Sequence, residues 1–219
     1  MREQIVKKIL SEKLIVIVRG VGKDRILPLA DALSRGGVKL MEVTYDASGA
    51  TPETETAEMI SMLKEHFGDK MSIGSGTTLS ERQVRMTKES GGEFIISPDT
   101  CRAVIEKTRE LDMVSIPGAL TPTEIADAHR YGADFVKLFP VSAYPPDYIK
   151  AVRAPLSHVR LLAVGGVNIS NMEVYRDAGV LGFGLGHTNI LRGLPEGADE
   201  AAFVELVSRY VSAAKGTGK

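Results

Sequence analysis

The hydrophobic residues of this chain follow two alternating patterns, short continuous runs and longer segments with helical spacing. Short apolar runs rich in β-branched residues predict strands that are covered on both faces of a parallel sheet. They lie at residues 14–18, 38–45, 71–73, 94–96, 113–116, 135–139, 159–164 and 180–185. Helices are predicted between and after them, at residues 24–35, 52–67, 80–86, 100–110, 121–131, 144–152, 168–178 and 198–215.

The order of these elements predicts the fold class. Strands that alternate with helices pair in parallel, and eight such units without a linker predict a closed (β/α)8 TIM barrel. Residues 1–219 are therefore expected to form one barrel domain, with an extra amphipathic helix at residues 1–9 and a disordered tail at residues 216–219. An open doubly wound sheet is the main alternative, but no GxGxxG motif follows the first strand.

Composition and charge argue against several classes of function. The 219 residues are 43% hydrophobic with a formal net charge of −1, so no nucleic-acid partner is expected. No apolar run approaches the roughly 18 residues of a membrane span, and no signal-peptide core is present, so no membrane partner is expected. The single cysteine, Cys101, cannot form an internal disulfide, which favours a cytoplasmic protein. No set of histidine, cysteine and carboxylate residues has metal-ligand spacing, so neither a metal nor another cofactor is expected.

The predicted strand at residues 135–139 contains a lysine, Lys137, among apolar residues. Burying a lysine as a cation is costly, so burial lowers its pKa and frees the amine to attack a carbonyl. Pro140 then ends the strand, because proline cannot donate to the sheet. The alternative interpretation is a lysine that extends to the rim of the sheet or pairs with a buried carboxylate.

A second ionisable residue, Glu42, lies between Met41 and Val43 in another predicted strand. Residues near the carboxyl ends of the strands of a barrel meet at one face, where TIM-barrel active sites lie. Glu42 is therefore predicted to act as a general acid and base beside Lys137. A purely structural ion pair between Glu42 and Lys137 is the alternative.

Glycine-rich sequences end three other strands. Gly165-Gly166 and Gly182–Gly186 end the last two strands, where backbone N–H groups of this fold commonly bind phosphate. Residues 74–78 offer backbone donors and two threonine hydroxyls, which suit a carboxylate or a carbonyl. Each glycine run could also serve only to make a tight turn.

Seven short motifs at the predicted strand ends occur together in one known family. They are Val18-Arg19-Gly20, Met41-Glu42-Val43-Thr44, Gly74-Ser75-Gly76-Thr77, Ile96-Ser97-Pro98, Pro117-Gly118 with Thr121-Pro122-Thr123-Glu124, Val136-Lys137-Leu138-Phe139-Pro140, and Gly165-Gly166-Val167-Asn168. In order and context the chain resembles the class I 2-keto-3-deoxy-6-phosphogluconate (KDPG) and 4-hydroxy-2-oxoglutarate (KHG) aldolases over nearly its whole length.

The resemblance implies a homotrimeric TIM-barrel lyase of carbohydrate metabolism that needs no metal. Its substrate would be a keto acid, usually phosphorylated, that is cleaved reversibly to pyruvate and an aldehyde. Lys137 would form a Schiff base with the substrate and Glu42 would shuttle protons, while Thr77 would hold the pyruvate carboxylate and Arg19 the distal phosphate. The further substrate-binding residues that it implies are Pro98, Phe139, Gly165, Gly166, Gly186 and His187.

Two residues depart from the family pattern. Asp46 stands where many members carry an arginine that helps to bind the pyruvate carboxylate, and His187 stands where a serine often contacts phosphate. The Schiff-base chemistry does not depend on either residue, but the choice among gluconate-, galactonate- and glutarate-derived keto acids stays open. Two other functions are alternatives: an isomerase of sugar phosphates in which Lys137 is only a cation, and a non-catalytic sensor of a sugar phosphate.

Overall fold

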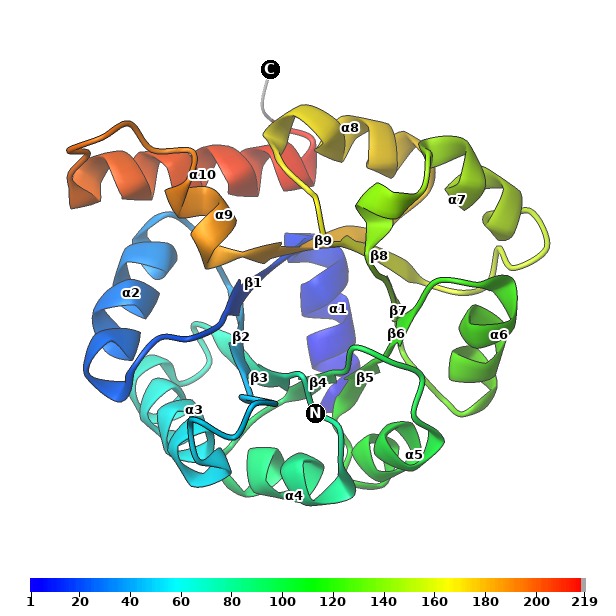
Figure 1. Ribbon diagram of the computed structural model, residues 1–219, viewed down its shortest axis with the longest axis horizontal. Coiled ribbons are helices and arrows are strands. Elements are labelled where there is room, and N and C mark those ends of the chain that lie inside the picture. Colours follow the sequence, from blue (N-terminus) through cyan, green and yellow to red (C-terminus); the bar gives the residue numbers. More distant parts are fainter. Residues whose placement is uncertain (218–219) are drawn as a thin grey trace.

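The computed structural model describes residues 1–217, which form a ring of short parallel strands surrounded by helices (Figure 1). The nine strands form one sheet in the order β5-β4-β3-β2-β1-β9-β8-β7-β6. They are β1 (Leu14–Val18), β2 (Leu40–Thr44), β3 (Ser72–Gly76), β4 (Phe94–Ile96), β5 (Val114–Ile116), β6 (Gly118–Ala119), β7 (Val136–Leu138), β8 (Leu161–Val164) and β9 (Gly182–Gly186).

The strands β5 and β6 together occupy one of eight positions around the barrel, because only Pro117 separates them. Proline has no backbone N–H and interrupts the ladder there. The backbone N–H of Phe135 donates to the Ser115 carbonyl at 3.2 Å, and that of Lys137 donates to the Pro117 carbonyl at 2.9 Å. These bonds join β7 to the β5–β6 segment and close the ring, so the predicted (β/α)8 barrel is confirmed.

The helices lie outside the strands, except for the first. They are α1 (Arg2–Glu12), α2 (Lys23–Arg35), α3 (Glu53–Phe67), α4 (Glu81–Glu89), α5 (Arg102–Glu110), α6 (Pro122–Arg130), α7 (Pro146–Arg153), α8 (Ile169–Asp177), α9 (His187–Leu191) and α10 (Glu200–Lys215). The predicted start of α6 is confirmed, because Thr121 and Glu124 form a reciprocal capping box. The sequence did not predict α9 or the 3-10 turn η1 (Val141–Ala143).

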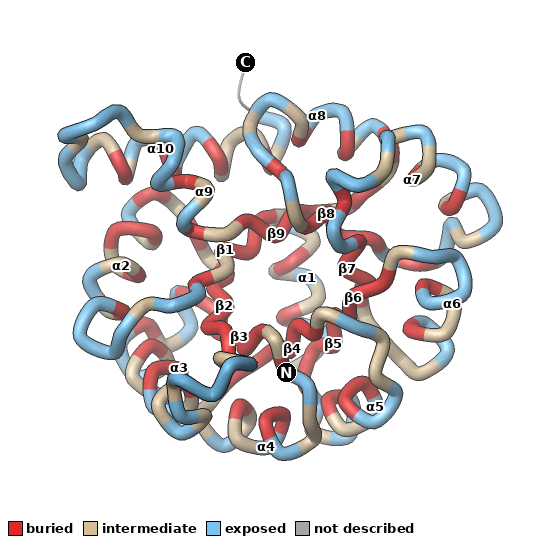
Figure 2. The backbone as a smooth tube through the Cα atoms, in the orientation of Figure 1, coloured by how far each residue is buried: buried red, intermediate tan, exposed pale blue. Residues whose placement is uncertain are grey.

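Side chains alternate along each strand between the interior of the barrel and the surrounding helices. Figure 2 shows that the strands are mostly buried. Leu40 and Phe135 belong to an inner apolar cluster, which also contains two residues of α1, whereas Met41 packs with the helices. Glu42 and Lys137 each follow an inner residue by two positions, so both point into the barrel. The other inner residues are Ile5, Ile9, Ile15, Phe94, Ile96, Val114, Ile116 and Leu162.

The helix α1 lies across the centre of the ring in Figure 1 and contacts β5 and β9. Ile5 and Ile9 of this helix are buried in the inner cluster, at the end of the barrel where the strands begin. The helix therefore covers that end and leaves the interior accessible from the end where the strands finish. No helix within residues 1–217 has the length and apolar character required to cross a bilayer.

The carboxyl end of the chain was expected to be disordered from residue 216. Gly216 instead ends α10 in the left-handed conformation, with φ at 75°, which glycine adopts readily. The backbone N–H of Thr217 donates to the Ser212 carbonyl at 3.0 Å. The rest of the expected tail, residues 218–219, lies outside the described residues.

Candidate active site

A central cavity of about 360 Å³ opens at the carboxyl ends of the strands. Of the ten site residues predicted from the sequence, nine line it: Arg19, Glu42, Thr77, Pro98, Lys137, Phe139, Gly165, Gly166 and Gly186. The other lining residues are Ile17, Val164, Val167, Gly184 and Asn189. The fold therefore collects side chains from distant parts of the chain around one space.

Lys137 enters this cavity from β7 and is only 8% exposed. Burial lowers the pKa of its amine, while the Glu42 carboxylate opposes that shift and the Arg19 guanidinium adds to it. Nζ lies 4.5 Å from the centroid of the Phe139 ring, and it donates no hydrogen bond to any group of residues 1–217. A buried amine with a lowered pKa and no fixed acceptor is suited to attack a carbonyl that enters the cavity.

Glu42 lies on β2, is 2% exposed and lines the same cavity. Burial raises the pKa of its carboxyl group, and Lys137, the Thr44 hydroxyl and Arg19 oppose this shift. Within the described residues, the carboxylate and the Lys137 amine are not close enough to form a direct ion pair. The structural ion pair considered as an alternative is therefore absent, and the space between the two groups belongs to the cavity.

Two neighbours fix the position of the Glu42 carboxylate. The Thr44 hydroxyl, two residues further along β2 and also buried, donates to Oε1 at 2.8 Å. Gly76 on β3 provides the space, because a Cβ atom at that position would overlap the carboxylate. The glycine of this motif therefore makes room for the Glu42 carboxylate, in addition to any role in the turn.

Arg19 and Thr77 meet across the mouth of the cavity, although they follow β1 and β3, which are separated by β2. Arg19 Nη2 donates to Thr77 Oγ1 at 2.8 Å. Thr77 has φ at 50°, a conformation that is strained for a β-branched residue and that occurs preferentially at functional sites. The next residue holds this turn in place, because the buried Thr78 hydroxyl forms a hydrogen bond of 2.9 Å with Ser75 Oγ.

The glycine-rich end of β8 forms the opposite wall. Gly165 and Gly166 have φ at 85° and 87°, which favours glycine at both positions. A Cβ atom at Gly166 would also overlap Ser142, so the backbone approaches the η1 turn too closely for any side chain. The result is a wall of exposed backbone, and the ring of Phe139 lies beside it, 39% exposed.

His187 is the one predicted site residue that does not line the central cavity. Its side chain lines a separate outer groove together with Arg25 and Phe203 of the neighbouring helices, and burial lowers its pKa. Asn189, two residues further along α9, faces the cavity instead. No motif pointed to Asn189, because the short helix α9 has no recognisable start signal in the sequence.

Asp46 also faces away from the cavity. Its carboxylate accepts hydrogen bonds from the backbone N–H groups of Ser48 and Thr51, both at 2.9 Å, and from the Ser48 hydroxyl at 2.7 Å. These bonds lower its pKa, with the Ser48 hydroxyl as the largest cause. Asp46 therefore organises the loop after β2.

A larger hollow of about 550 Å³ lies near α1, at the other end of the barrel. Two of its three lysines are engaged: Lys8 Nζ donates to Ser72 Oγ at 3.0 Å, and Lys64 Nζ donates to Glu93 Oε1 at 3.0 Å. Paired amines of this kind are poor nucleophiles, unlike Lys137.

Within residues 1–217, no group of three or more histidine, cysteine or acidic residues is arranged to hold a metal ion.

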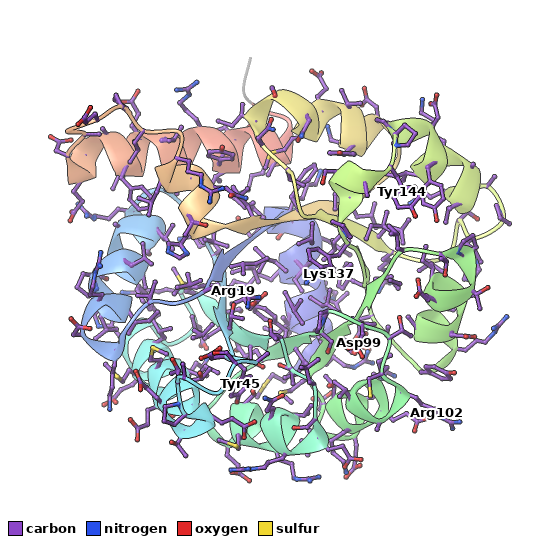
Figure 3. All side chains as sticks on the ribbon, viewed as in Figure 1. Arg19, Tyr45, Asp99, Arg102, Lys137 and Tyr144 are labelled. Atoms are coloured by element: carbon purple, nitrogen blue, oxygen red, sulfur yellow. The ribbon has the colours of Figure 1, made fainter. Side chains whose placement is uncertain are left out.

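Figure 3 shows how the labelled side chains lie relative to the ring of strands. Arg19 and Lys137 lie inside the ring, whereas Tyr144 and Arg102 lie among the outer elements.

A family model for KDPG and KHG aldolase matches residues 5–188 of the chain. The chain belongs to the KDPG and KHG aldolase family. Membership of this family confirms the resemblance seen in the sequence and makes the protein a lyase of the class I aldolase type.

Individual relatives of this aldolase agree with the family assignment. The 2-dehydro-3-deoxy-6-phosphogalactonate aldolase of Escherichia coli K12 is 36% identical over 174 residues, which are 79% of this chain and 82% of the relative. The 2-dehydro-3-deoxy-phosphogluconate aldolase of Haemophilus influenzae is 29% identical over 79% of each chain.

Solved structures of related aldolases have the same fold. A native KDPGal structure superimposes with a TM-score of 0.81 and 31% identity, covering 93% of this chain and 95% of that one. The KDPG aldolase of Legionella pneumophila, with pyruvate captured as a covalent carbinolamine intermediate, has a TM-score of 0.76 and 25% identity over 98% of each chain. The covalent intermediate of that relative agrees with Schiff-base chemistry in this family.

Proposed function

We propose that this aldolase cleaves a 2-keto-3-deoxy sugar acid phosphate, of the galactonate or gluconate series, to pyruvate and glyceraldehyde 3-phosphate. The single observation that carries the proposal is the buried Lys137 amine, which faces a cavity shared with Glu42 and has no fixed acceptor within residues 1–217. Cleavage of 4-hydroxy-2-oxoglutarate to pyruvate and glyoxylate would use the same residues, since both substrates have a ketone at C2 and a hydroxyl at C4.

In the proposed reaction, Lys137 Nζ attacks the C2 ketone, and loss of water gives a protonated imine. The C4 hydroxyl loses its proton to Glu42 through a water molecule, C4 becomes the aldehyde carbonyl, and the electrons of the C3–C4 bond pass into the imine to form an enamine. Glu42 then returns a proton to C3. Hydrolysis of the new imine releases pyruvate and restores the free amine.

The walls of the cavity suit the two ends of such a substrate. Thr77 offers a hydroxyl to the same cavity as Lys137 and is proposed to bind the carboxylate. The backbone of Gly165, Gly166 and Gly186 is proposed to bind the distal phosphate, with Pro98 and Phe139 covering the carbon chain.

We further propose a cytoplasmic homotrimer, which rests on the family resemblance and, for the compartment, on the single cysteine.

Borohydride reduction in the presence of pyruvate tests the proposal. Reduction of the imine should attach a three-carbon adduct to Lys137, identified by peptide mass mapping, and Lys137→Met should abolish it. A panel of phosphorylated and unphosphorylated 2-keto-4-hydroxy acids, scored by pyruvate release, would identify the substrate series. Turnover of any of these acids by Lys137→Met at the rate of the unaltered enzyme would exclude the imine mechanism.

A further inference from the structure

We propose that Gln83 and Thr87, two buried residues of α4, are positioning residues: they hold the turn that follows β3 and thereby place the Thr77 hydroxyl from outside the central cavity. The inference rests on the proposed Schiff-base function, because the place of Thr77 matters only if a substrate enters the cavity. Neither Gln83 nor Thr87 lines the cavity, and no motif in the sequence singles them out. The strain of the turn, two sets of contacts and their apolar surroundings support this role.

The turn after β3 needs support because its conformation is strained. Thr77 has φ at 50°, and such strain persists only where the surrounding contacts determine the conformation. The Thr78 N–H donates to the Ile96 carbonyl at 3.3 Å, which is long for a backbone hydrogen bond. The Leu79 side chain is 45% exposed, so packing does little to fix it. Hydrogen bonds from side chains elsewhere must therefore hold the turn.

The first set of contacts runs through Gln83. The Leu79 N–H donates to Gln83 Oε1 at 2.6 Å, and Gln83 Nε2 donates to Glu53 Oε1, at the start of α3, at 2.8 Å. Gln83 is buried, so both bonds are largely shielded from water. An amide that is held at both ends cannot rotate freely. Gln83 therefore fixes the turn at a point two residues beyond Thr77.

The second set of contacts runs through Thr87. Its Oγ1 forms a hydrogen bond of 2.8 Å with Ser75 Oγ, which lies 2.9 Å from Thr78 Oγ1. The Tyr45 hydroxyl forms a further hydrogen bond of 3.1 Å with Thr87 Oγ1. All four residues are buried. This chain of hydroxyls joins α4 to the residue next to Thr77, while Thr77 itself lines the cavity.

The surroundings of the hydroxyl chain are apolar. Ser75 pairs with Val43 of β2 and Ile95 of β4, and both of these residues belong to apolar clusters. Apolar side chains at positions 75 and 87 would need no partners there, and exchanging a hydrogen-bonded pair for apolar groups of the same shape can be nearly neutral for stability. A connected polar network instead rigidifies one arrangement of the groups that it joins. The hydroxyl chain therefore serves the conformation of the turn more than the stability of the fold.

Steady-state kinetics of Thr87→Val test the inference, with the 2-keto-4-hydroxy acid that the unaltered enzyme cleaves fastest. Valine keeps the shape of threonine without the hydroxyl, so kcat/KM should fall by about five- to thirtyfold, the effect of losing a buried hydrogen bond. Thr87→Ser keeps the hydroxyl and should return kcat/KM to within about threefold of the unaltered enzyme. In Thr77→Ala, which keeps Lys137 and Glu42, adding Thr87→Val should lower kcat/KM by less than about twofold, because the group to be positioned is gone.

Thr108 of α5 provides a matched control. It is buried, and its Oγ1 donates to the Val104 carbonyl, four residues earlier, at 2.7 Å. Thr87 Oγ1 likewise lies 2.8 Å from the Gln83 carbonyl, four residues earlier, but only Thr87 is also linked to β3. Thr108→Val should therefore lower the unfolding temperature about as much as Thr87→Val does and leave kcat/KM within about twofold of the unaltered enzyme. Thermal unfolding followed by circular dichroism gives the unfolding temperatures and confirms that each variant folds.

Gln83→Met removes the link to Leu79 and should show the same loss of kcat/KM and the same dependence on Thr77, so it tests the turn even if Thr87→Val does not fold. Unchanged kcat/KM in either folded variant would overturn the inference. An equal loss in the Thr77→Ala background, or a loss in Thr108→Val as large as that in Thr87→Val, would also overturn it. These results would leave the proposed function intact, because borohydride trapping of pyruvate by the unaltered enzyme would still show the imine. Absence of trapping in the unaltered enzyme would instead defeat the proposed function, and the role of the turn with it.

Discussion

Replacement of Gly76 by alanine would displace the Glu42 carboxylate without removing it. A Cβ atom at position 76 would overlap the Glu42 carboxylate, whose Oε1 is held by Thr44. Gly76 does not have a positive φ, so alanine can adopt its backbone conformation. The strand that carries it, β3, pairs with β2 on one side and β4 on the other, and the Tyr45 N–H donates to the Gly76 carbonyl at 2.8 Å. We therefore expect the carboxylate to move and the strand to stay.

The magnitude follows from the role of the displaced group. A positioned general acid and base contributes about 10²- to 10⁴-fold to rate, which corresponds to roughly 3–5 kcal/mol of activation free energy. Overpacking of a core by one methyl group costs about 1–3 kcal/mol of stability. Since domains are stable by about 5–15 kcal/mol, the Gly76→Ala protein should remain folded while losing most of its activity.

Pyruvate release coupled to lactate dehydrogenase gives kcat/KM for four proteins: the unaltered enzyme, Gly76→Ala, Glu42→Ala and the double variant. If the methyl group acts through the carboxylate, Gly76→Ala should have almost no further effect when Glu42 is already alanine. Thermal unfolding followed by circular dichroism confirms that each variant folds. Equal losses in both backgrounds, or a Gly76→Ala enzyme within about threefold of full activity, would refute the displacement of Glu42, since the expected loss is at least about 10².

Two further predictions concern the ionisation of the reacting pair. Thr44→Val removes the hydroxyl that donates to Glu42, so the pKa of Glu42 should rise further and the acidic limb of the pH profile of kcat/KM should move to higher pH. Thr44→Ser keeps a hydroxyl and should return the limb to its original pH. A limb that does not move in Thr44→Val would contradict the role of this hydrogen bond. The second prediction concerns stability at pH 7. Folding lowers the pKa of Lys137 from 10.5, which costs stability below that pH, and raises the pKa of Glu42 from 4.5, which costs stability above that pH. Both costs apply at pH 7, so the inactive double variant Lys137→Met/Glu42→Gln should have a free energy of unfolding in urea about 1–4 kcal/mol higher than that of the unaltered enzyme. A free energy of unfolding below that of the unaltered enzyme would contradict the two pKa shifts.

The fold and the two buried ionisable residues could be predicted because each rests on a local pattern in the sequence. A buried strand must be apolar, so an ionisable side chain in the middle of one is conspicuous, as Lys137 and Glu42 both are. The period of two along a strand then places each residue relative to its neighbours: Leu40 and Phe135 point inward, and therefore Glu42 and Lys137 do too. The structure is needed to identify the inner face, because strands that are apolar on both faces do not reveal which one lines the barrel.

Side chains in the loops after the strands could not be placed in the same way. His187 and Asn189 lie two residues apart on α9, yet one faces an outer groove and the other faces the cavity. No hydrophobic period extends through such a short helix, so the sequence does not fix its rotation. The direction of Arg19 is likewise decided by a partner 58 residues away, Thr77, because the exposed residue Arg19 has no local packing to orient it.

The separation between Lys137 and Glu42 supports the proposed chemistry over a structural ion pair. Burial lowers the pKa of the amine and raises that of the carboxyl group, so the two values approach each other and the pH at which the enzyme works. Their mutual attraction opposes both shifts, and it would be stronger at contact distance, because Coulomb energy grows as two charges approach in a poorly solvated site. The cavity keeps the groups out of direct contact, and the room for the Glu42 carboxylate depends on Gly76. Desolvation can therefore prevail at both residues, which suits the amine to the proposed role of nucleophile and the carboxyl group to the proposed exchange of protons.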